Sequence, residues 1–179
     1  MFAEAVAIVQ AQEVRSVSRN SRAANVAGDL LKAMRELSVL PLTTLTPAEV
    51  IESHFAGMSM DDLVRELAAG RLCGGRGREA SDLEFPAWQF VEPARQLLPP
   101  VMRAVHEAGG VDPRYFWTIR YEGLFDLTPA ELLCGKLFVT RRSVSMEQAD
   151  YLARSDKERQ RIVVAHHEAL LAERDGPHA

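Results

Sequence analysis

The sequence has 179 residues, of which 47% are hydrophobic, and its formal net charge is -4. This composition predicts a globular chain with one core or two small ones, and the negative charge excludes a general attraction to nucleic acid. No run of about 18 apolar residues is long enough to cross a membrane, and the start lacks the basic region and cleavage site of a secretory signal. The two cysteines form no CxxC pair, which favours a reducing, cytoplasmic environment.

Helical periodicity dominates the N-terminal part of the chain. Apolar residues recur at helical spacing over residues 2–17 and again over 23–37, with a polar break at 16–22 between the two stretches. Pro41 and the threonines after it separate this part from the rest. We therefore expect residues 1–40 to form a helical arm, which could serve as a dimerisation element.

The five-residue motif LTPAE occurs twice, at 45–49 and at 127–131. In each copy the threonine can cap a helix, the proline suits the first helical position, and the glutamate can close a capping box. The leucine before the cap is placed to pack on the fourth helical residue, Val50 or Leu132. We interpret the repeat as two similar helix starts rather than a duplication, because the flanking sequences do not otherwise align.

Two short helices are predicted after the first LTPAE. One runs from Pro47 to about Phe55, and the next begins after Ser59 as its cap and ends at Gly70. The inner face of the second helix is expected to carry three aliphatic residues, which are Leu63, Val64 and Leu67. The tight turn at 56–58 between these helices gives a helix-turn-helix outline.

A β-hairpin is predicted to follow this helix pair. Residues 71–73, then 83–85 and 88–90, read as extended segments, and the glycine-rich stretch 74–78 between them carries arginines. A helix-turn-helix with an arginine-bearing hairpin is the layout of a winged DNA-binding domain, which would span residues 41–92. The residues expected to contact DNA are Ser59, Arg65, Arg71, Arg76 and Arg78.

One feature of the predicted reading helix opposes DNA contact. Its first turn contains Asp61 and Asp62, and two carboxylates facing phosphates would repel them. The alternative interpretation is a helical pair packed on the core beside an exposed arginine loop.

Residues 93–179 are predicted to form a C-terminal helical interaction domain. Its expected helices are one introduced by Pro99-Pro100 that runs through His106, one capped by Asp112-Pro113, one from the second LTPAE to about Phe138, one started by Ser145 with Gln148, and a charged one from about Lys157 to Glu173. An aromatic set is expected to bury between hairpin and C-terminal domain, namely Phe85, Trp88, Phe90, Tyr115, Phe116 and Trp117.

No catalytic pattern is present in the sequence. The five histidines give no HExxH spacing, and there is no GxSxG and no Walker-type phosphate loop. Cys73 and Cys134 have no evident partner histidine and are expected to be structural. We therefore expect a protein that is not an enzyme and that needs no cofactor and no metal.

Residues 83–137 resemble a known class of bacterial proteins. The stretch EFPAWQF at 84–90 is similar to the YPAFQF element of the MbcA/ParS/Xre-type antitoxins. The hydrophobic segment 97–105, the helix bearing Trp117, and LTPAELL at 127–133 follow in the order of that family, which has GRTPLELL in the last position. Here Asp126-Leu127 stands in place of the family's glycine-arginine, and the chain continues well past this helix.

The resemblance implies two binding roles. Members of this family pair with a toxin, often an NAD-degrading one of the RES-domain class, and many bind their own promoter through a helix-turn-helix. Carried over to this sequence, the partner-binding residues would be Trp117, Thr128 and Pro129.

Two functions are therefore expected from the sequence. The first is a mainly α, non-enzymatic DNA-binding transcription regulator of antitoxin-like architecture. The second is a protein-interaction module, an antitoxin or adaptor that binds a partner protein without contacting nucleic acid. Either would be a homodimer that does not associate with membranes.

Overall fold

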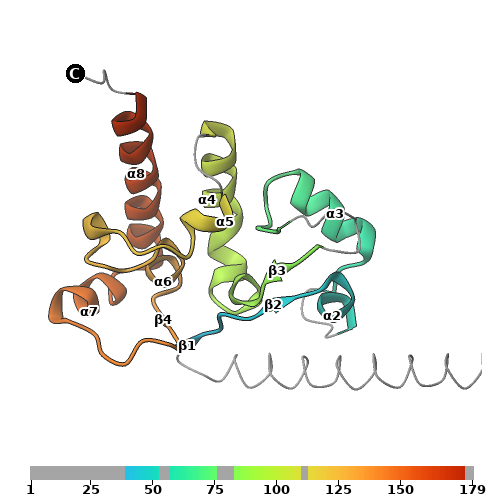
Figure 1. The fold of residues 1–179 in the computed structure, drawn as a ribbon, viewed down its shortest axis with the longest axis horizontal. Coiled ribbons are helices and arrows are strands. Elements are labelled where there is room, and N and C mark those ends of the chain that lie inside the picture. The colour runs from blue at the N-terminus through green and yellow to red at the C-terminus, as the bar shows by residue number, and fades with distance from the viewer. Residues whose placement is uncertain (1–38, 53–56, 76–82, 110–112, 176–179) are drawn as a thin grey trace, which may run out of the picture.

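The computed structural model describes residues 39–52, 57–75, 83–109 and 113–175. Over these ranges the fold is mainly helical, with two small two-stranded sheets, as Figure 1 shows. None of the helices in these ranges is long and apolar enough to cross a membrane. The predicted N-terminal arm up to residue 38, and with it the expected dimerisation role, lies outside the described residues.

The elements follow in the order β1 (Val39–Leu40), β2 (Thr44–Leu45), α2 (Pro47–Glu52), α3 (Met60–Ala68), β3 (Phe85–Pro86), η2 (Ala87–Phe90), α4 (Ala94–Ala108), α5 (Pro113–Phe116), η3 (Glu122–Leu124), α6 (Pro129–Cys134), β4 (Leu137–Phe138), α7 (Met146–Leu152) and α8 (Asp156–Asp175). The two sheets join distant parts of the chain. Strand β1 pairs in parallel with β4, and β2 pairs antiparallel with β3.

Both LTPAE motifs begin helices through capping boxes, as the sequence predicts. At the start of α2 the Glu49 carboxylate accepts the Thr46 backbone N–H at 2.8 Å, and Glu131 accepts that of Thr128 at 3.0 Å at the start of α6. Each threonine hydroxyl in turn accepts the N–H of its glutamate. The two boxes differ in their surroundings, because the first lies at the surface and the second is fully buried.

The predicted hairpin is wrong in its details. Strand β3 pairs with β2, and the backbone pairing between the two expected arms is an isolated antiparallel bridge between Gly75 and Glu84 rather than a ladder, among the described residues. Residues 87–90 form a 3₁₀-helix instead of a strand. The reason is Gln89, whose buried side-chain amide takes the place of a strand by donating to the Cys73 carbonyl at 2.7 Å and accepting the Cys73 N–H at 2.9 Å.

Several predicted helix limits also need correction. Helix α4 begins at Ala94 and runs through both Pro99 and Pro100. Helix α6 ends at Cys134, and Gly135 follows with a φ of 62°, so the stretch expected to remain helical becomes β4. A side chain at Gly135 would start 2.9 Å from the buried guanidinium of Arg159, which explains a glycine there beyond its left-handed backbone.

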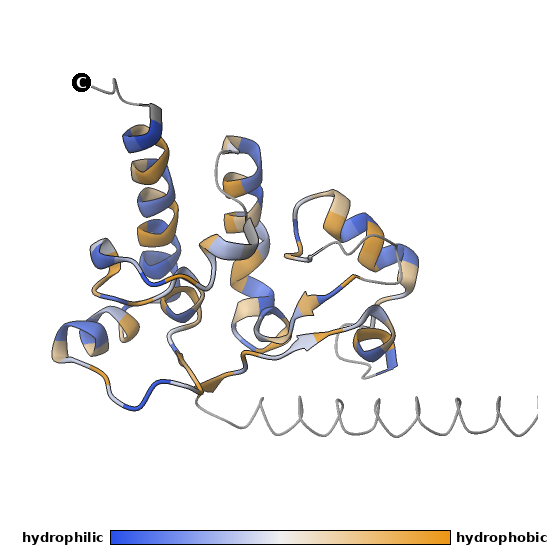
Figure 2. Cartoon of the chain, in the orientation of Figure 1, coloured by the Kyte–Doolittle hydropathy of each residue, from blue (hydrophilic) through white to orange (hydrophobic). Residues whose placement is uncertain are grey.

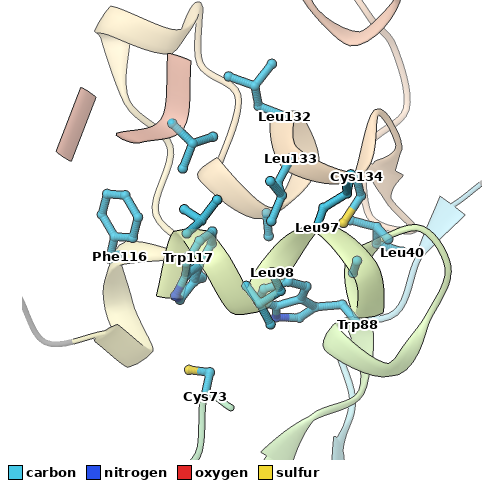
Figure 3. Packing of buried hydrophobic residues seen from close by; sticks show 14 of the residues in the cluster. Leu40, Cys73, Trp88, Leu97, Leu98, Phe116, Trp117, Leu132, Leu133 and Cys134 are labelled. Atoms are coloured by element: carbon cyan, nitrogen blue, oxygen red, sulfur yellow. The ribbon is translucent and has the colours of Figure 1, made fainter. Parts of the chain in front are cut away.

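The larger hydrophobic core lies between α4, α6 and α8 and the segment around Trp88. Trp117 packs against Trp88 with ring centroids 5.6 Å apart and against Phe116 at 5.1 Å. Figure 3 shows the two indoles beside α4, with Leu132 and Leu133 on α6 above them in this view. The aromatic set is buried as expected except for Tyr115, which is exposed.

A smaller hydrophobic cluster holds α2 and α3 against β2 and β3. It contains Leu45, Val50, Leu63 and Phe85, with Leu67 partly buried beside them. Val64 was expected on this inner face but is exposed, because it lies one residue past Leu63 and so points away from the cluster. In Figure 2, hydrophilic and hydrophobic residues alternate along both α3 and α8, as expected for helices with one buried face.

Two adjacent histidines of α8 pack against aromatic residues of the segment from α5 to η3. His167 is buried edge-on against Phe116 at 5.2 Å, and His166 packs on Tyr121 at 4.6 Å. Neither Nε2 atom has a hydrogen-bond partner among the described residues. Burial lowers the pKa of both imidazoles, and it outweighs the opposing effects of Glu173 on His166 and of Glu168 on His167.

We expect the protein to become less stable as the pH is lowered from about 6.5. The unfolded chain takes up protons at the ordinary histidine pKa, whereas burial in the folded chain disfavours protonation of both imidazoles. Their contribution to the free energy of unfolding is therefore fully present above the ordinary pKa and is lost as the pH falls from there through the lowered folded pKa values. Urea unfolding at pH 7.5 and pH 5.5 measures this loss. His167→Phe should reduce the difference between the two pH values, and an equal difference in both proteins would contradict the assignment.

Candidate interaction surfaces

The first candidate surface is the exposed side of α3, which the sequence predicts as a DNA-reading helix. Ser59 caps this helix, with its hydroxyl accepting the Asp62 N–H at 3.2 Å and the Asp62 carboxylate accepting the Ser59 N–H at 2.9 Å. The hydrogen bonds that Ser59 donates to the Asp62 carboxylate lower the pKa of this carboxyl group. Ser59 is thus used in the cap, and the first turn of α3 carries negative charge.

The two described arginines of this surface are both paired with carboxylates. Arg65 forms an ion pair with Asp62 one turn away. Arg71 holds Glu66 with both arms of its guanidinium, at 2.6 Å and 2.7 Å. The hydrogen bonds of this second pair lower the pKa of Glu66 and raise that of Arg71. Since each arginine charge is balanced locally, the described part of α3 and its C-terminal end offers little excess positive charge to a phosphate backbone.

The base of the predicted arginine loop lies within the structure. The Gly75 N–H donates to the Glu84 carbonyl at 2.9 Å, and the Glu84 N–H donates back at 3.2 Å. This bridge brings together the two ends of residues 76–82, and Arg76 and Arg78 themselves lie outside the described residues.

The second candidate surface is built on the buried carboxylate of Glu131. Besides closing its capping box, Glu131 accepts the Phe138 N–H at 2.9 Å and two hydrogen bonds from Arg141, at 3.1 Å and 3.0 Å. Burial alone would raise the pKa of this carboxyl group, but the hydrogen bonds from Arg141 and from the Thr128 and Phe138 backbones outweigh burial and lower it. Arg141 is held in place as a result.

Arg141 also fixes a backbone loop that has an unusual conformation. Its guanidinium donates to the Asp126 carbonyl, and the Gln148 side chain donates to the Phe125 carbonyl at 2.7 Å. Phe125 and Asp126 have φ values of 55° and 59°, a left-handed region that aspartate adopts more readily than most residues but that a bulky phenylalanine seldom adopts. The Phe125 backbone therefore stores strain that the surrounding contacts must hold.

The loop leaves one apolar side chain half-exposed, and three further exposed apolar side chains lie between β4 and the start of α7. Phe125 is 44% exposed, although its ring packs on Tyr151 at 4.9 Å. Met146, which begins α7 beside the Gln148 that holds the loop, is 81% exposed. Val139 and Val144 on the connection between β4 and α7 are exposed as well. We call Phe125, Met146, Val144 and Val139 the α7-side surface.

The three predicted partner-binding residues lie in the core beneath this surface. Trp117 is 0% exposed, and Thr128 and Pro129 are buried at the start of α6. The Trp117 carbonyl accepts the Ala130 N–H at 3.2 Å, which ties the aromatic segment to the helix start. Because all three are buried in the described structure, they can affect partner binding only indirectly, through the exposed residues that they help to position.

Phe125 and Met146 are not among the residues that the sequence predicts for a binding surface. The sequence does indicate that Met146 is exposed. It stands just after the capping Ser145 and before an acidic residue, which is a position at the exposed end of a helix. The same Ser-Met-acid arrangement occurs at Ser59-Met60-Asp61. No sequence signal announces a phenylalanine in the left-handed conformation.

Neither a metal centre nor a reactive thiol is found among the described residues. Across the described ranges, no three histidine, cysteine or acidic side chains are grouped to hold a metal ion. Cys73 and Cys134 are buried and are not joined in a disulfide bond, and burial raises the pKa of Cys134 to about 12. Comparison of the chain with protein-family models, with curated proteins and with solved structures finds no significant match.

Proposed function

We propose that this protein is a non-enzymatic interaction module that binds a partner protein through the α7-side surface. The observation that carries the proposal is the strained loop at Phe125 and Asp126, which is held by Arg141 and Gln148 and keeps an aromatic ring half-exposed. Backbone strain that the fold maintains is typical of functional sites. Exposed aromatic and methionine side chains are also the residues that protein interfaces favour.

The resemblance of residues 83–137 to antitoxins supports a specific kind of partner. The family's glycine-arginine corresponds to Asp126-Leu127, so the difference in sequence begins at Asp126, the second left-handed residue of the loop. We therefore propose a toxin-like protein encoded beside this one as the partner. Two buried cysteines that are not joined in a disulfide bond are compatible with the cytoplasmic location that such a role needs.

Met146→Glu is expected to abolish binding of this partner without harming the fold. Glutamate in the first turn of α7 suits the helix dipole, while a carboxylate in place of an apolar contact opposes burial in an interface. Met60→Glu is the matched control, because Met60 holds the same position after the cap of α3 on the other surface. The measurement is co-purification of the tagged protein with the product of the adjacent gene.

The wild type and Met60→Glu should retain the partner, and Met146→Glu should lose it at unchanged circular dichroism. Equal retention by both variants would remove the α7-side surface from the proposal. Loss in the Met60→Glu variant alone would move the partner to α3.

DNA binding by the winged arrangement is our second candidate function. The specific observation in its favour is the antiparallel bridge that joins Gly75, just before the predicted arginine loop, to Glu84, just after it. The paired arginines and the acidic first turn of α3 weigh against it. A titration with DNA upstream of the gene at two salt concentrations separates the candidates, because phosphate contacts weaken steeply with salt.

A further inference from the structure

A groove of about 380 Å³ runs between α4 and α8, and none of the four residues of the α7-side surface lines it. Its floor is apolar and includes Val101, Val164 and Ala165, while Lys157, Arg161 and Glu168 line it on the α8 side. Figure 1 shows these two helices side by side, with α8 at the edge of the molecule. Ala165 is exposed, so a second helix can approach the α8 backbone closely at this point.

The charges along this face of α8 follow a fixed order. Lys157 and Arg161 come first, Val164 and Ala165 follow, and Glu168 comes last. Within the described residues none of the three charged side chains forms an ion pair. Lys157 and Arg161 are four residues apart, a spacing at which like charges on a helix repel each other. The face is therefore short of negative charge at one end and of positive charge at the other.

An antiparallel copy of the same helix supplies what each end lacks. Arg161 and Glu168 lie seven residues, or two helical turns, apart with Val164 and Ala165 midway between them. If a two-fold axis passes between Val164 and Ala165, then Arg161 of each copy faces Glu168 of the other, and the small apolar residues meet at the centre. Such an arrangement is isologous, so every favourable contact occurs twice. A parallel arrangement would instead place like charges together.

We infer that the groove between α4 and α8 is a homodimer interface in which α8 packs antiparallel against α8 of a second copy. This inference rests on the order of charges and on the exposed Ala165, and it is independent of the proposed toxin-like partner. It is also distinct from the dimerisation role expected of residues 1–40.

The test is a charge swap within the full-length chain. Arg161→Glu and Glu168→Arg should each weaken self-association at least tenfold in sedimentation equilibrium, because each places two pairs of like charges in the interface. The double variant R161E/E168R should return the dissociation constant to within a few-fold of the wild-type value. Both positions are exposed, so circular dichroism should show an unchanged fold.

Three results would overturn the inference. One is a wild-type chain that remains monomeric over the measured concentrations. Another is a dimer that neither single variant weakens, as expected if residues outside the groove hold it. The third is a double variant as weak as the single ones, since the reversed charges would then not face each other.

Discussion

Glu131→Ala is expected to lower the free energy of unfolding by about 3–5 kcal/mol, which is the usual cost of breaking a buried ion pair by removing one partner. The Glu131 side chain is fully buried and accepts hydrogen bonds from Arg141 and from the Thr128 and Phe138 backbones. Alanine would leave these donors without their acceptor and Arg141 without its counter-charge. Urea unfolding followed by tryptophan fluorescence measures the change.

The chain contains its own control for this experiment. Glu49 closes the same capping box in the first LTPAE, but at the surface and without an arginine. Glu49→Ala should therefore cost only the loss of a helix cap, about 0.3–1.5 kcal/mol. Equal losses for the two variants would show that the Arg141 pair adds nothing to the cap. Glu131→Ala should also impair partner binding, because Arg141 holds the loop that displays Phe125.

Trp117→Ala is expected to cost a further large amount, about 3–5 kcal/mol, through the cavity that it leaves. The Trp117 side chain packs between Trp88 and Phe116. Its removal would therefore loosen the contact between the FPAWQF segment and the C-terminal helices. The measurement is again the free energy of unfolding, with Trp88 as the remaining fluorophore.

Two further variants show whether the cost comes from lost packing. The Trp117 indole N–H has no hydrogen-bond partner among the described residues, so Trp117→Phe loses no hydrogen bond and should cost less than half as much as the alanine variant. Tyr115 lies two positions before Trp117, and its side chain is exposed. Tyr115→Ala should therefore change the free energy of unfolding by less than about 0.5 kcal/mol. A Trp117→Phe variant as unstable as Trp117→Ala would contradict a packing role.

The helix starts could be predicted from the sequence because their causes are local. Thr46, Ser59, Thr128 and Ser145 each cap a helix, and the residue three positions later closes the box in every case. Capping depends on four or five neighbouring residues, so a motif such as LTPAE carries the whole instruction. The charged helix α8 was predictable for a similar reason, since its length and composition indicate it without tertiary contacts.

The pairing of strands and the exposed surfaces could not be predicted in the same way. Strand β3 pairs with β2, forty residues away along the chain, because Gln89 already satisfies the Cys73 backbone that the hairpin would have used. No local pattern marks Phe125 as an exposed residue, and only the Arg141 and Gln148 contacts show how its loop is held. Both outcomes depend on contacts between residues distant in sequence, for which local patterns carry no signal.

Phe125→Asn is expected to weaken partner binding in a folded protein, because the strained loop displays the Phe125 ring as part of the binding surface. Asparagine adopts the left-handed backbone readily, so the loss of the ring contact with Tyr151 should be largely offset by relief of strain, and stability should change by less than about 1 kcal/mol. Titration calorimetry with the product of the adjacent gene should give a dissociation constant at least about 30-fold weaker than that of the wild type, the loss of about 2 kcal/mol typical of a central interface contact. An unchanged affinity in a well-folded Phe125→Asn variant would contradict the account.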